Sequence, residues 1–209
     1  MRLTKFGHAC VRIESDGGVL VIDPGMFTEP EALDGVDAVL ITHEHADHLN
    51  VDALADALSK RLSVTIFTHP VVAAKLNSLA GVVTSVEAGQ TFEAAGMTVK
   101  AYGGWHAEIH PDVPRVPNLG FLVNGSVYHP GDSFDVPTDA EVETLFVPIS
   151  APWLKLSESV EFVRKVKPRR AFPLHDALLS EAGHRVTDNM MSQLVGCEYR
   201  HVEPGTTLD

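Results

Sequence analysis

The chain has 209 residues, 44% of them hydrophobic and 21% charged, with a formal net charge of −12. This composition predicts one folded domain spanning residues 1–209, and the acidic balance argues against a nucleic-acid partner. No apolar stretch approaches the ~18 residues that a membrane helix needs, and no export signal follows Met1. Only two cysteines are present, Cys10 and Cys197, which indicates a reducing, cytoplasmic compartment.

Two short apolar segments near the start of the chain predict a β-hairpin. Residues 10–14 alternate between apolar and polar, residues 19–22 are continuously apolar, and Asp16-Gly17 lies between them. Asp-Gly is a typical two-residue hairpin turn. Asp23-Pro24 ends the second strand and places Asp23 at a strand end.

A third apolar run, residues 38–41, leads directly into a polar stretch at 42–48. A helix is expected from the N-cap Asn50 to residue 59, followed by a strand at 64–67. A second helix is expected to begin at Pro70, because three later apolar residues share one helical face. These are Val72, Leu76 and Leu79.

In the second half, short β-rich runs at 82–102 predict a meander. Asn124-Gly125, between the apolar segments 119–123 and 126–129, predicts a hairpin that ends at Pro130-Gly131-Asp132. The remaining expected elements are a strand at 145–147, a helix capped by Ser157 that ends before Pro168, a strand at 171–172, a helix at 187–195 with the apolar face Met190, Met191, Leu194 and Val195, and a last strand and turn at 198–208.

The stretch Thr42-His43-Glu44-His45-Ala46-Asp47-His48 predicts a metal site. Neutral imidazole and carboxylate are the side chains that hold zinc, iron, cobalt or manganese. Alternate positions on an extended backbone aim His43 and His45 the same way, and Asp47 and His48 then serve a second, adjacent metal. A solvated loop that is merely rich in histidine is the weaker interpretation, because four potential ligands cluster at the end of an apolar strand.

Further candidate residues each follow a predicted strand, and their order is informative. They are Asp23, His106, Asp132 and His175. The His-x-His-x-Asp-His motif with these later residues resembles the signature of the metallo-β-lactamase superfamily. Phe6-Gly7-His8-Ala9, leading into Val21-Ile22-Asp23-Pro24, resembles a narrower branch of small intracellular hydrolases that includes L-ascorbate-6-phosphate lactonase.

This resemblance implies an α/β fold, a four-layer αββα sandwich of two similar halves with the metals in a groove between them. It implies two divalent metal ions, zinc first and manganese or iron as alternatives. The implied ligands are His43, His45 and His106 for one metal, Asp47, His48 and His175 for the other, and Asp132 as the bridge.

Two adjacent cations lower the pKa of a shared water, so the implied activity is hydrolysis of a small-molecule ester, lactone or phosphoester by a metal-bridging hydroxide. Asp47 would then be catalytic as well as a ligand. His8 matches the Gly-His pair of the branch and is expected to transfer a proton or contact the leaving group. Asp23 is expected to orient a ligand imidazole.

Three residues beside the predicted ligands are candidates for the substrate pocket: Trp105, Glu108 and Trp153. The loop at 107–118 is expected to form a wall or lid of the groove. His129 is expected to support the Asp132 turn, and His184 and His201 are expected on the surface.

Two other functions remain open at this point. A mononuclear iron dioxygenase that acts on a sulfur substrate carries the same motif, and a non-catalytic metal-binding or scaffold protein would retain the ligands. The expected partner is a small-molecule substrate. Several relatives in the branch form homo-oligomers, but the substrate, the native metal and the oligomeric state are not fixed by these residues.

Overall fold

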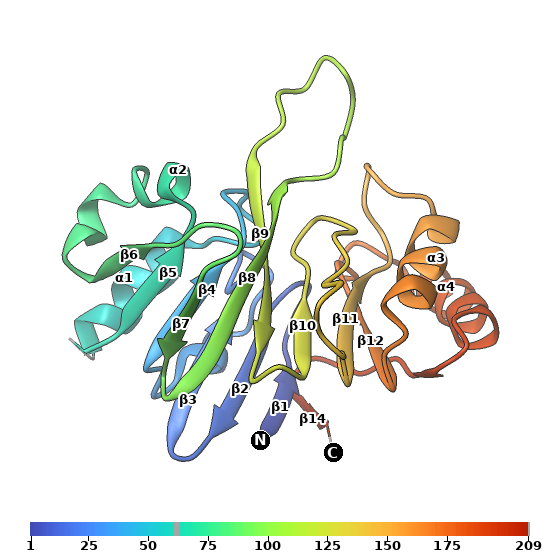
Figure 1. The fold of residues 1–209 in the computed structure, drawn as a ribbon, viewed down its shortest axis with the longest axis horizontal. Helices are drawn as coiled ribbons and strands as arrows, with labels where there is room; N and C mark the ends of the chain where they lie inside the picture. The colour runs from blue at the N-terminus through green and yellow to red at the C-terminus, as the bar shows by residue number, and fades with distance from the viewer. Residues whose placement is uncertain (61–62, 209) are drawn as a thin grey trace.

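The computed structural model describes residues 1–60 and 63–208. It consists of two seven-stranded sheets packed face to face, with helices on both sides of the pair (Figure 1). This arrangement confirms the expected α/β sandwich.

The first sheet contains both ends of the chain, which lie side by side on strands β1 and β14 (Figure 1). Its strands, in spatial order, are β14 (Thr206–Leu208), β1 (Arg2–Lys5), β2 (Val11–Ser15), β3 (Gly18–Ile22), β4 (Ala38–Ile41), β5 (Thr65–Thr68) and β6 (Val83–Ser85). The three pairings from β14 to β3 are antiparallel, and the three from β3 to β6 are parallel.

The second sheet repeats this pattern. Its strands, in spatial order, are β7 (Thr91–Ala94), β8 (Met97–Trp105), β9 (Pro117–Val123), β10 (Val127–His129), β11 (Thr144–Pro148), β12 (Arg170–Leu174) and β13 (Glu198–Tyr199). Again three antiparallel pairings precede three parallel ones. The two halves of the chain are therefore similar, and β3 and β10 occupy equivalent places in them.

Three apolar clusters make the layers. The central cluster joins inward-facing residues of both sheets, such as Leu40 from β4 and Phe121 from β9. A second cluster packs the outer face of the first sheet against α1 (Val51–Lys60) and α2 (Pro70–Ala73). A third packs the second sheet against α3 (Leu156–Val166) and α4 (Glu181–Leu194). Alternate side chains of a strand point to opposite faces, so each sheet is covered on both sides.

Both predicted hairpin turns are confirmed. Asp16 and Gly17 have φ angles of 50° and 84°, and Asn124 and Gly125 have φ angles of 49° and 64°. Positive φ at both central residues is what a two-residue hairpin turn of this kind requires. The predicted N-cap of α1 is also present, since Asn50 Oδ1 accepts a hydrogen bond from the Ala53 N–H at 3.1 Å.

Two predictions about the middle of the chain were wrong. The segment at 82–102 is not one meander: β6 pairs with β5 in the first sheet, whereas β7 and β8 form a hairpin in the second. The helix from Pro70 is only one turn long, and a 3₁₀ helix (Asn77–Val82) follows it.

The C-terminal predictions also needed correction. Helix α3 is capped at Lys155, where the Glu158 carboxylate accepts from the backbone N–H, and Ser157 lies inside the first turn. Helix α4 begins six residues earlier than predicted, with Ser180 as its N-cap. Met191 and Val195 are buried as predicted, but Met190 and Leu194 are exposed. Residues 198–208 supply one short strand to each sheet.

Two further features complete the fold. The connection between β8 and β9 projects beyond the sheets (Figure 1). Among the residues that the structure describes, no helix is long and apolar enough to cross a membrane.

Candidate metal centre

The predicted metal stretch is the loop between β4 and α1. Its backbone bends back on itself, because the His48 and Leu49 amides both donate to the His45 carbonyl, at 3.0 and 2.9 Å. The turn packs tightly against Gly25, where a Cβ atom would lie 1.8 Å from the Asp47 carbonyl oxygen. Only glycine permits this approach, so Gly25 fixes the loop against the end of β3.

His43, His45 and His106 form one group of potential ligands. His43 Nε2 lies 3.1 Å from His45 Nδ1, and the His106 ring centroid lies 5.0 and 4.8 Å from theirs. The His106 Nδ1–H donates to the Ala107 carbonyl at 2.5 Å, which leaves Nε2 without a proton. The Thr42 hydroxyl donates to Asp23, so it accepts from His43 Nδ1 and fixes the same tautomer there. Both rings therefore present a lone pair to the group.

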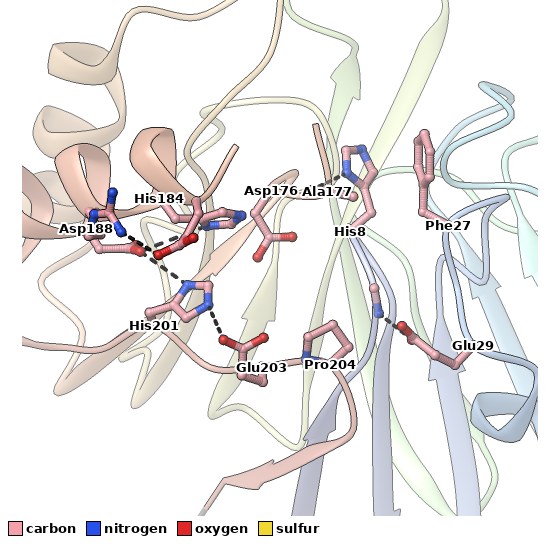
Figure 2. Close-up of a pocket in the computed structure, with 13 residues that line it drawn as sticks. His8, Phe27, Glu29, Asp176, Ala177, His184, Asp188, His201, Glu203 and Pro204 are labelled. Carbon is pink, nitrogen blue, oxygen red and sulfur yellow. Dashed lines mark hydrogen bonds and ion pairs between the residues drawn. The ribbon is translucent and has the colours of Figure 1, made fainter. Parts of the chain in front are cut away.

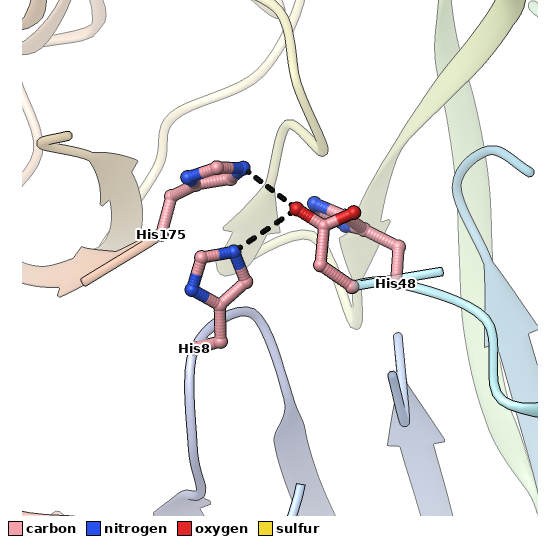
Figure 3. Close-up of side chains that lie close together, drawn as sticks. His8, His48 and His175 are labelled. Carbon is pink, nitrogen blue, oxygen red and sulfur yellow. Dashed lines mark hydrogen bonds and ion pairs between the residues drawn. The ribbon is translucent and has the colours of Figure 1, made fainter. Parts of the chain in front are cut away.

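Asp47, His48, His175 and His8 form a second group (Figure 3). His175 Nδ1–H donates to the Ser150 carbonyl at 2.6 Å, and its Nε2 lies 3.2 Å from Asp47 Oδ2. His48 Nδ1–H donates to Asp23 Oδ2 at 2.7 Å, so its Nε2 faces the centre.

His8 differs from the other histidines in its tautomer. Its Nδ1 accepts from the Ala177 backbone N–H at 3.3 Å, and a backbone amide can only donate. The proton of neutral His8 is therefore on Nε2, which lies 3.2 Å from Asp47 Oδ2. His8 presents an N–H to the centre, whereas His43 and His106 present lone pairs.

Asp132 joins the two groups. Its Oδ1 lies 3.1 Å from His48 Nε2, and its Oδ2 lies 3.1 Å from His175 Nε2 and 3.3 Å from His106 Nε2. Asp132 comes from the turn after β10, and Asp23 comes from the equivalent end of β3 in the other half. Each half thus supplies one strand-end aspartate to the site. Asp132 lies between the two groups, and Asp23 contacts His48 on the side away from Asp132.

The donor set fits divalent metal ions. Three buried atoms, His48 Nε2, His106 Nε2 and Asp132 Oδ1, find no hydrogen-bond partner within residues 1–60 and 63–208. Zinc–ligand bonds of about 2.0–2.2 Å place tetrahedral donors about 3.3 Å apart, close to the separations around Asp132. Nitrogen and oxygen donors without a thiolate suit zinc, manganese or iron.

The electrostatics of the centre favour positive charge. Burial opposes charge on Asp132, but His48 and His175 hold the pKa of this carboxyl well below its usual range. The pKa of His175 is raised to about 9, because Asp132 and Asp47 outweigh the effect of its burial. The pKa of His48 is raised well above its usual value, because Asp132 and Asp23 likewise outweigh burial. Burial, and then the charge of His48, lower the pKa of His43.

Several supporting residues could not be recognised in the sequence. Asn118 Oδ1 accepts from the Asp132 N–H at 3.0 Å, and its Nδ2 donates to the Pro130 carbonyl. Lys5 and Asp176 form a buried ion pair of 2.9 Å directly after His175. Asn118 gave no signal beyond a polar residue beside an apolar run, and nothing in the local pattern connects Lys5 with Asp176.

The three predicted pocket residues lie in different surroundings. Trp153 Nε1–H donates to Asp132 Oδ2 at 2.9 Å, and its ring packs beside His106 and His175. Trp105 is 55% exposed, with the Arg115 guanidinium over its ring, and Glu108 is exposed in the projecting loop. The structure therefore brings Trp153 to the centre and leaves Trp105 and Glu108 facing outward. His129 supports the Asp132 turn as predicted, since its Nδ1 accepts from the Gly131 N–H.

A cavity of about 700 Å³ opens beside His8 (Figure 2). We call it the His8 cavity; Phe27, Asp176 and residues of α4 are part of its wall. His184 and His201, which were expected on the surface, are half-buried and also line it. Helix α4 and the C-terminal segment come together here, a contact that the sequence pattern did not reveal.

Comparison with known proteins matches this geometry to a family. A family model described as a β-lactamase superfamily domain matches residues 2–175, which include all seven predicted ligands. Protein Rv0786c of Mycobacterium tuberculosis is 35% identical over 206 residues, 96% of this chain and 95% of that protein. The UPF0173 metal-dependent hydrolase MK1542 of Methanopyrus kandleri is 32% identical over 196 residues, 84% of each chain. The structure of Igni18, a metallo hydrolase of Ignicoccus hospitalis, superposes with a TM-score of 0.77 at 20% identity, covering 99% of this chain and 97% of that one.

Proposed function

We propose that this chain, which belongs to the β-lactamase superfamily domain family and is a metal-dependent hydrolase, binds two divalent metal ions and cleaves a small-molecule ester, lactone or phosphoester. The observation that carries the proposal is the position of Asp132. Its two carboxylate oxygens reach both groups of potential ligands.

The donor groups support the following ligand set. His43, His45 and His106 would hold one ion, and Asp47, His48 and His175 the other, with Asp132 between them. Two adjacent divalent ions supply an activated water at neutral pH and polarise the oxygen of the bond to be cleaved. Zinc is the first candidate metal, with manganese or iron as alternatives.

No protein nucleophile is required in this proposal. Cys10 is buried, and burial raises the pKa of its thiol, so it is not a nucleophile at neutral pH. Trp153 holds Asp132 through its indole N–H and forms an apolar surface beside the ligands.

His8 is the proposed group for proton transfer or for contact with the leaving group. Its Nε2–H points to Asp47, and its position on the His8 cavity puts that proton beside the space where a small molecule would lie. Burial lowers the pKa of His8, so the neutral ring can accept a proton during the reaction and then return it. A cavity of this volume accommodates a metabolite-sized substrate.

Replacing His8 separates proton transfer from metal binding. We expect His8→Asn to lower kcat by about 10²–10⁴-fold, the usual contribution of a general acid or base, with unchanged metal content. A loss of bound metal in this variant would instead make His8 a ligand.

The hydrolase proposal is tested by activity screens on protein purified without an affinity tag or chelator. Lactones, carboxyl esters, phosphomonoesters and phosphodiesters would be compared. We expect hydrolysis that a chelator removes and added metal restores, and that Asp132→Ala abolishes. Asp56→Ala is the matched control, because Asp56 lies exposed on α1 and pairs with exposed Lys60.

Two outcomes would overturn the proposal. Wild-type rates in Asp132→Ala would remove the bridging carboxylate from the reaction. Oxygen consumption with a persulfide by protein that holds about one iron, without hydrolysis, would favour the dioxygenase. We further place the chain in the cytoplasm, because Cys10 and Cys197 are both free thiols.

A further inference from the structure

A second cluster of potential metal ligands lies on the far wall of the His8 cavity (Figure 2). His184 and Asp188 are four residues apart on α4, so their side chains lie on the same face of the helix. His201 comes from the segment after β13 and closes the group from the other side. We call these three residues the α4 cluster.

The donor atoms of the α4 cluster have the spacing of a metal site. Asp188 Oδ2 lies 3.2 Å from His201 Nδ1 and 4.0 Å from His184 Nδ1. Bonds of about 2.0–2.2 Å to zinc place donors about 3.3 Å apart in a tetrahedral site and further apart when the angle at the metal is wider. The imidazole rings meet edge to face, with centroids 4.8 Å apart.

Both imidazole nitrogens that face Asp188 lack a hydrogen bond. His184 Nδ1 and His201 Nδ1 are buried and find no hydrogen-bond partner in the described part of the chain, although the Asp188 carboxylate is close. A structural His–Asp–His network would align an N–H with the carboxylate, because leaving a buried polar atom unsatisfied costs about 1–3 kcal/mol. The main centre shows the same feature at His48 Nε2 and His106 Nε2.

Neighbouring side chains orient the donor atoms of the α4 cluster toward one another. The Tyr199 hydroxyl donates to Asp188 Oδ1 at 2.6 Å, which leaves Oδ2 facing the histidines. Glu203 Oε1 lies 3.5 Å from His201 Nε2, and a proton on Nε2 leaves a lone pair on Nδ1. Carboxylates and other acceptors commonly hold ligand imidazoles in this way.

We propose that His184, Asp188 and His201 form an additional binding site for a divalent metal ion of the zinc class. Two imidazoles and one carboxylate leave at least one coordination position open, and all three residues line the cavity that also contains His8. An oxygen or nitrogen donor of a bound small molecule can occupy that position. The site goes beyond the proposed hydrolase function and does not depend on it.

Zinc binding measured by equilibrium dialysis at a buffered free-zinc concentration tests this site. We expect the double variant His184→Gln/His201→Gln to bind one zinc ion fewer per chain than wild type. His110→Gln, which changes an exposed histidine, is the control and should bind as wild type does. Equal zinc content in wild type and the double variant would overturn the proposal.

Two further measurements keep the result decisive if the double variant folds poorly. In His43→Ala/Asp132→Ala/His175→Ala, which removes a ligand from each group of the main centre as well as the bridge, one zinc ion should remain, and additional His201→Gln should remove it. Zinc-edge anomalous diffraction from wild-type crystals should show a peak between His184, Asp188 and His201. Absence of that peak at a free-zinc concentration that fills the main centre would also overturn the proposal.

Discussion

The hydrogen-bond partners of individual histidines support the roles proposed for them at the centre. His106 and His175 donate Nδ1–H to backbone carbonyls and turn Nε2 toward the centre, whereas His8 accepts at Nδ1 and presents N–H. Metal ligands need the first arrangement and a proton donor needs the second. Three residues at this site, His8, Asp23 and His175, have positive φ angles between 49° and 59°. Strained backbone of this kind is concentrated at functional sites.

Asp23 is expected to act on the metal through His48 and Thr42. It accepts from Thr42 N–H, the Thr42 hydroxyl and His48 Nδ1–H. We expect Asp23→Asn to lower zinc affinity about 10–100-fold, the usual effect of losing such a partner, in competition titrations with a chromophoric chelator. Asp16→Asn, in an exposed turn that tolerates asparagine, should leave the affinity unchanged. Wild-type affinity in Asp23→Asn would remove Asp23 from the support of the ligands.

The buried Lys5–Asp176 pair is expected to stabilise the end of β12, after which His175 follows. Lys5 is fully buried and Asp176 nearly so. Removing one partner leaves a buried charge alone, so Lys5→Met should lower the free energy of unfolding by about 3–5 kcal/mol in urea titrations. Lys60→Met, which breaks the exposed pair with Asp56, should cause little change. Equal effects of the two substitutions would contradict this account.

The proposed ligands lie where strands end. The loop after β4, the turn after β10 and the loop after β12 each begin at the carboxyl end of a strand in the parallel part of a sheet, and Asp23 follows β3. Gly131 makes the turn after β10 possible: its φ is 62°, and an added Cβ would lie 2.3 Å from Asn118 Oδ1. The position of Asp132 therefore depends on a glycine as well as on its own partners.

Alanine at Gly131 is expected to disturb the centre. Gly125→Ala is a matched control, because Gly125 has nearly the same φ, 64°, and open space around its Cβ position. Both variants incur the cost of a left-handed backbone, about 1–2 kcal/mol. Only Gly131→Ala adds the collision, so we expect a larger loss of stability in urea titrations and a lower metal content. Equal metal content in the two variants would argue against this role.

Much of this arrangement could be predicted from the sequence, because strand-end ligands follow recognisable apolar runs. The strand-end positions of the stretch at 42–48, Asp23 and Asp132 were predicted from such runs, and the ligand role of Asp132 was implied by the family resemblance. The α4 cluster was not, although His184 and Asp188 have helical i,i+4 spacing. The helix was predicted to begin at residue 187, so His184 fell outside it, and His201 reaches the cluster only through the tertiary fold. The carbonyls of Ala107 and Ser150 that orient two rings leave no trace in residue types at all.

At the scale of the whole molecule, the centre connects the two sheets. His43, His45, Asp47 and His48 follow a strand of the first sheet, whereas His106, Asp132 and His175 follow strands of the second. The central apolar cluster holds the sheets together from the side of their buried faces. Bound metal would add a link between the halves at the end where the loops meet.

Removal of metal is therefore expected to lower the melting temperature of the wild-type chain. A ligand present at 100 times its Kd stabilises the folded state by about 2.7 kcal/mol, and each kcal/mol shifts Tm by about 2–4 °C in a chain of this length. Calorimetry with and without a chelator would measure the shift. The chelator should shift the melting temperature of Asp132→Ala less than that of wild type. An equal shift in this variant would mean that the stabilising metal is not bound at Asp132.

The central claim is that Asp132 joins two metal ions held by ligands from both sheets. Zinc-edge anomalous diffraction from crystals of the metal-loaded chain tests it most directly. The account predicts two peaks on either side of the Asp132 carboxylate, one within about 2.0–2.2 Å of donors from His43, His45 and His106, and the other beside Asp47, His48 and His175. A single peak, or none, among these residues would contradict it.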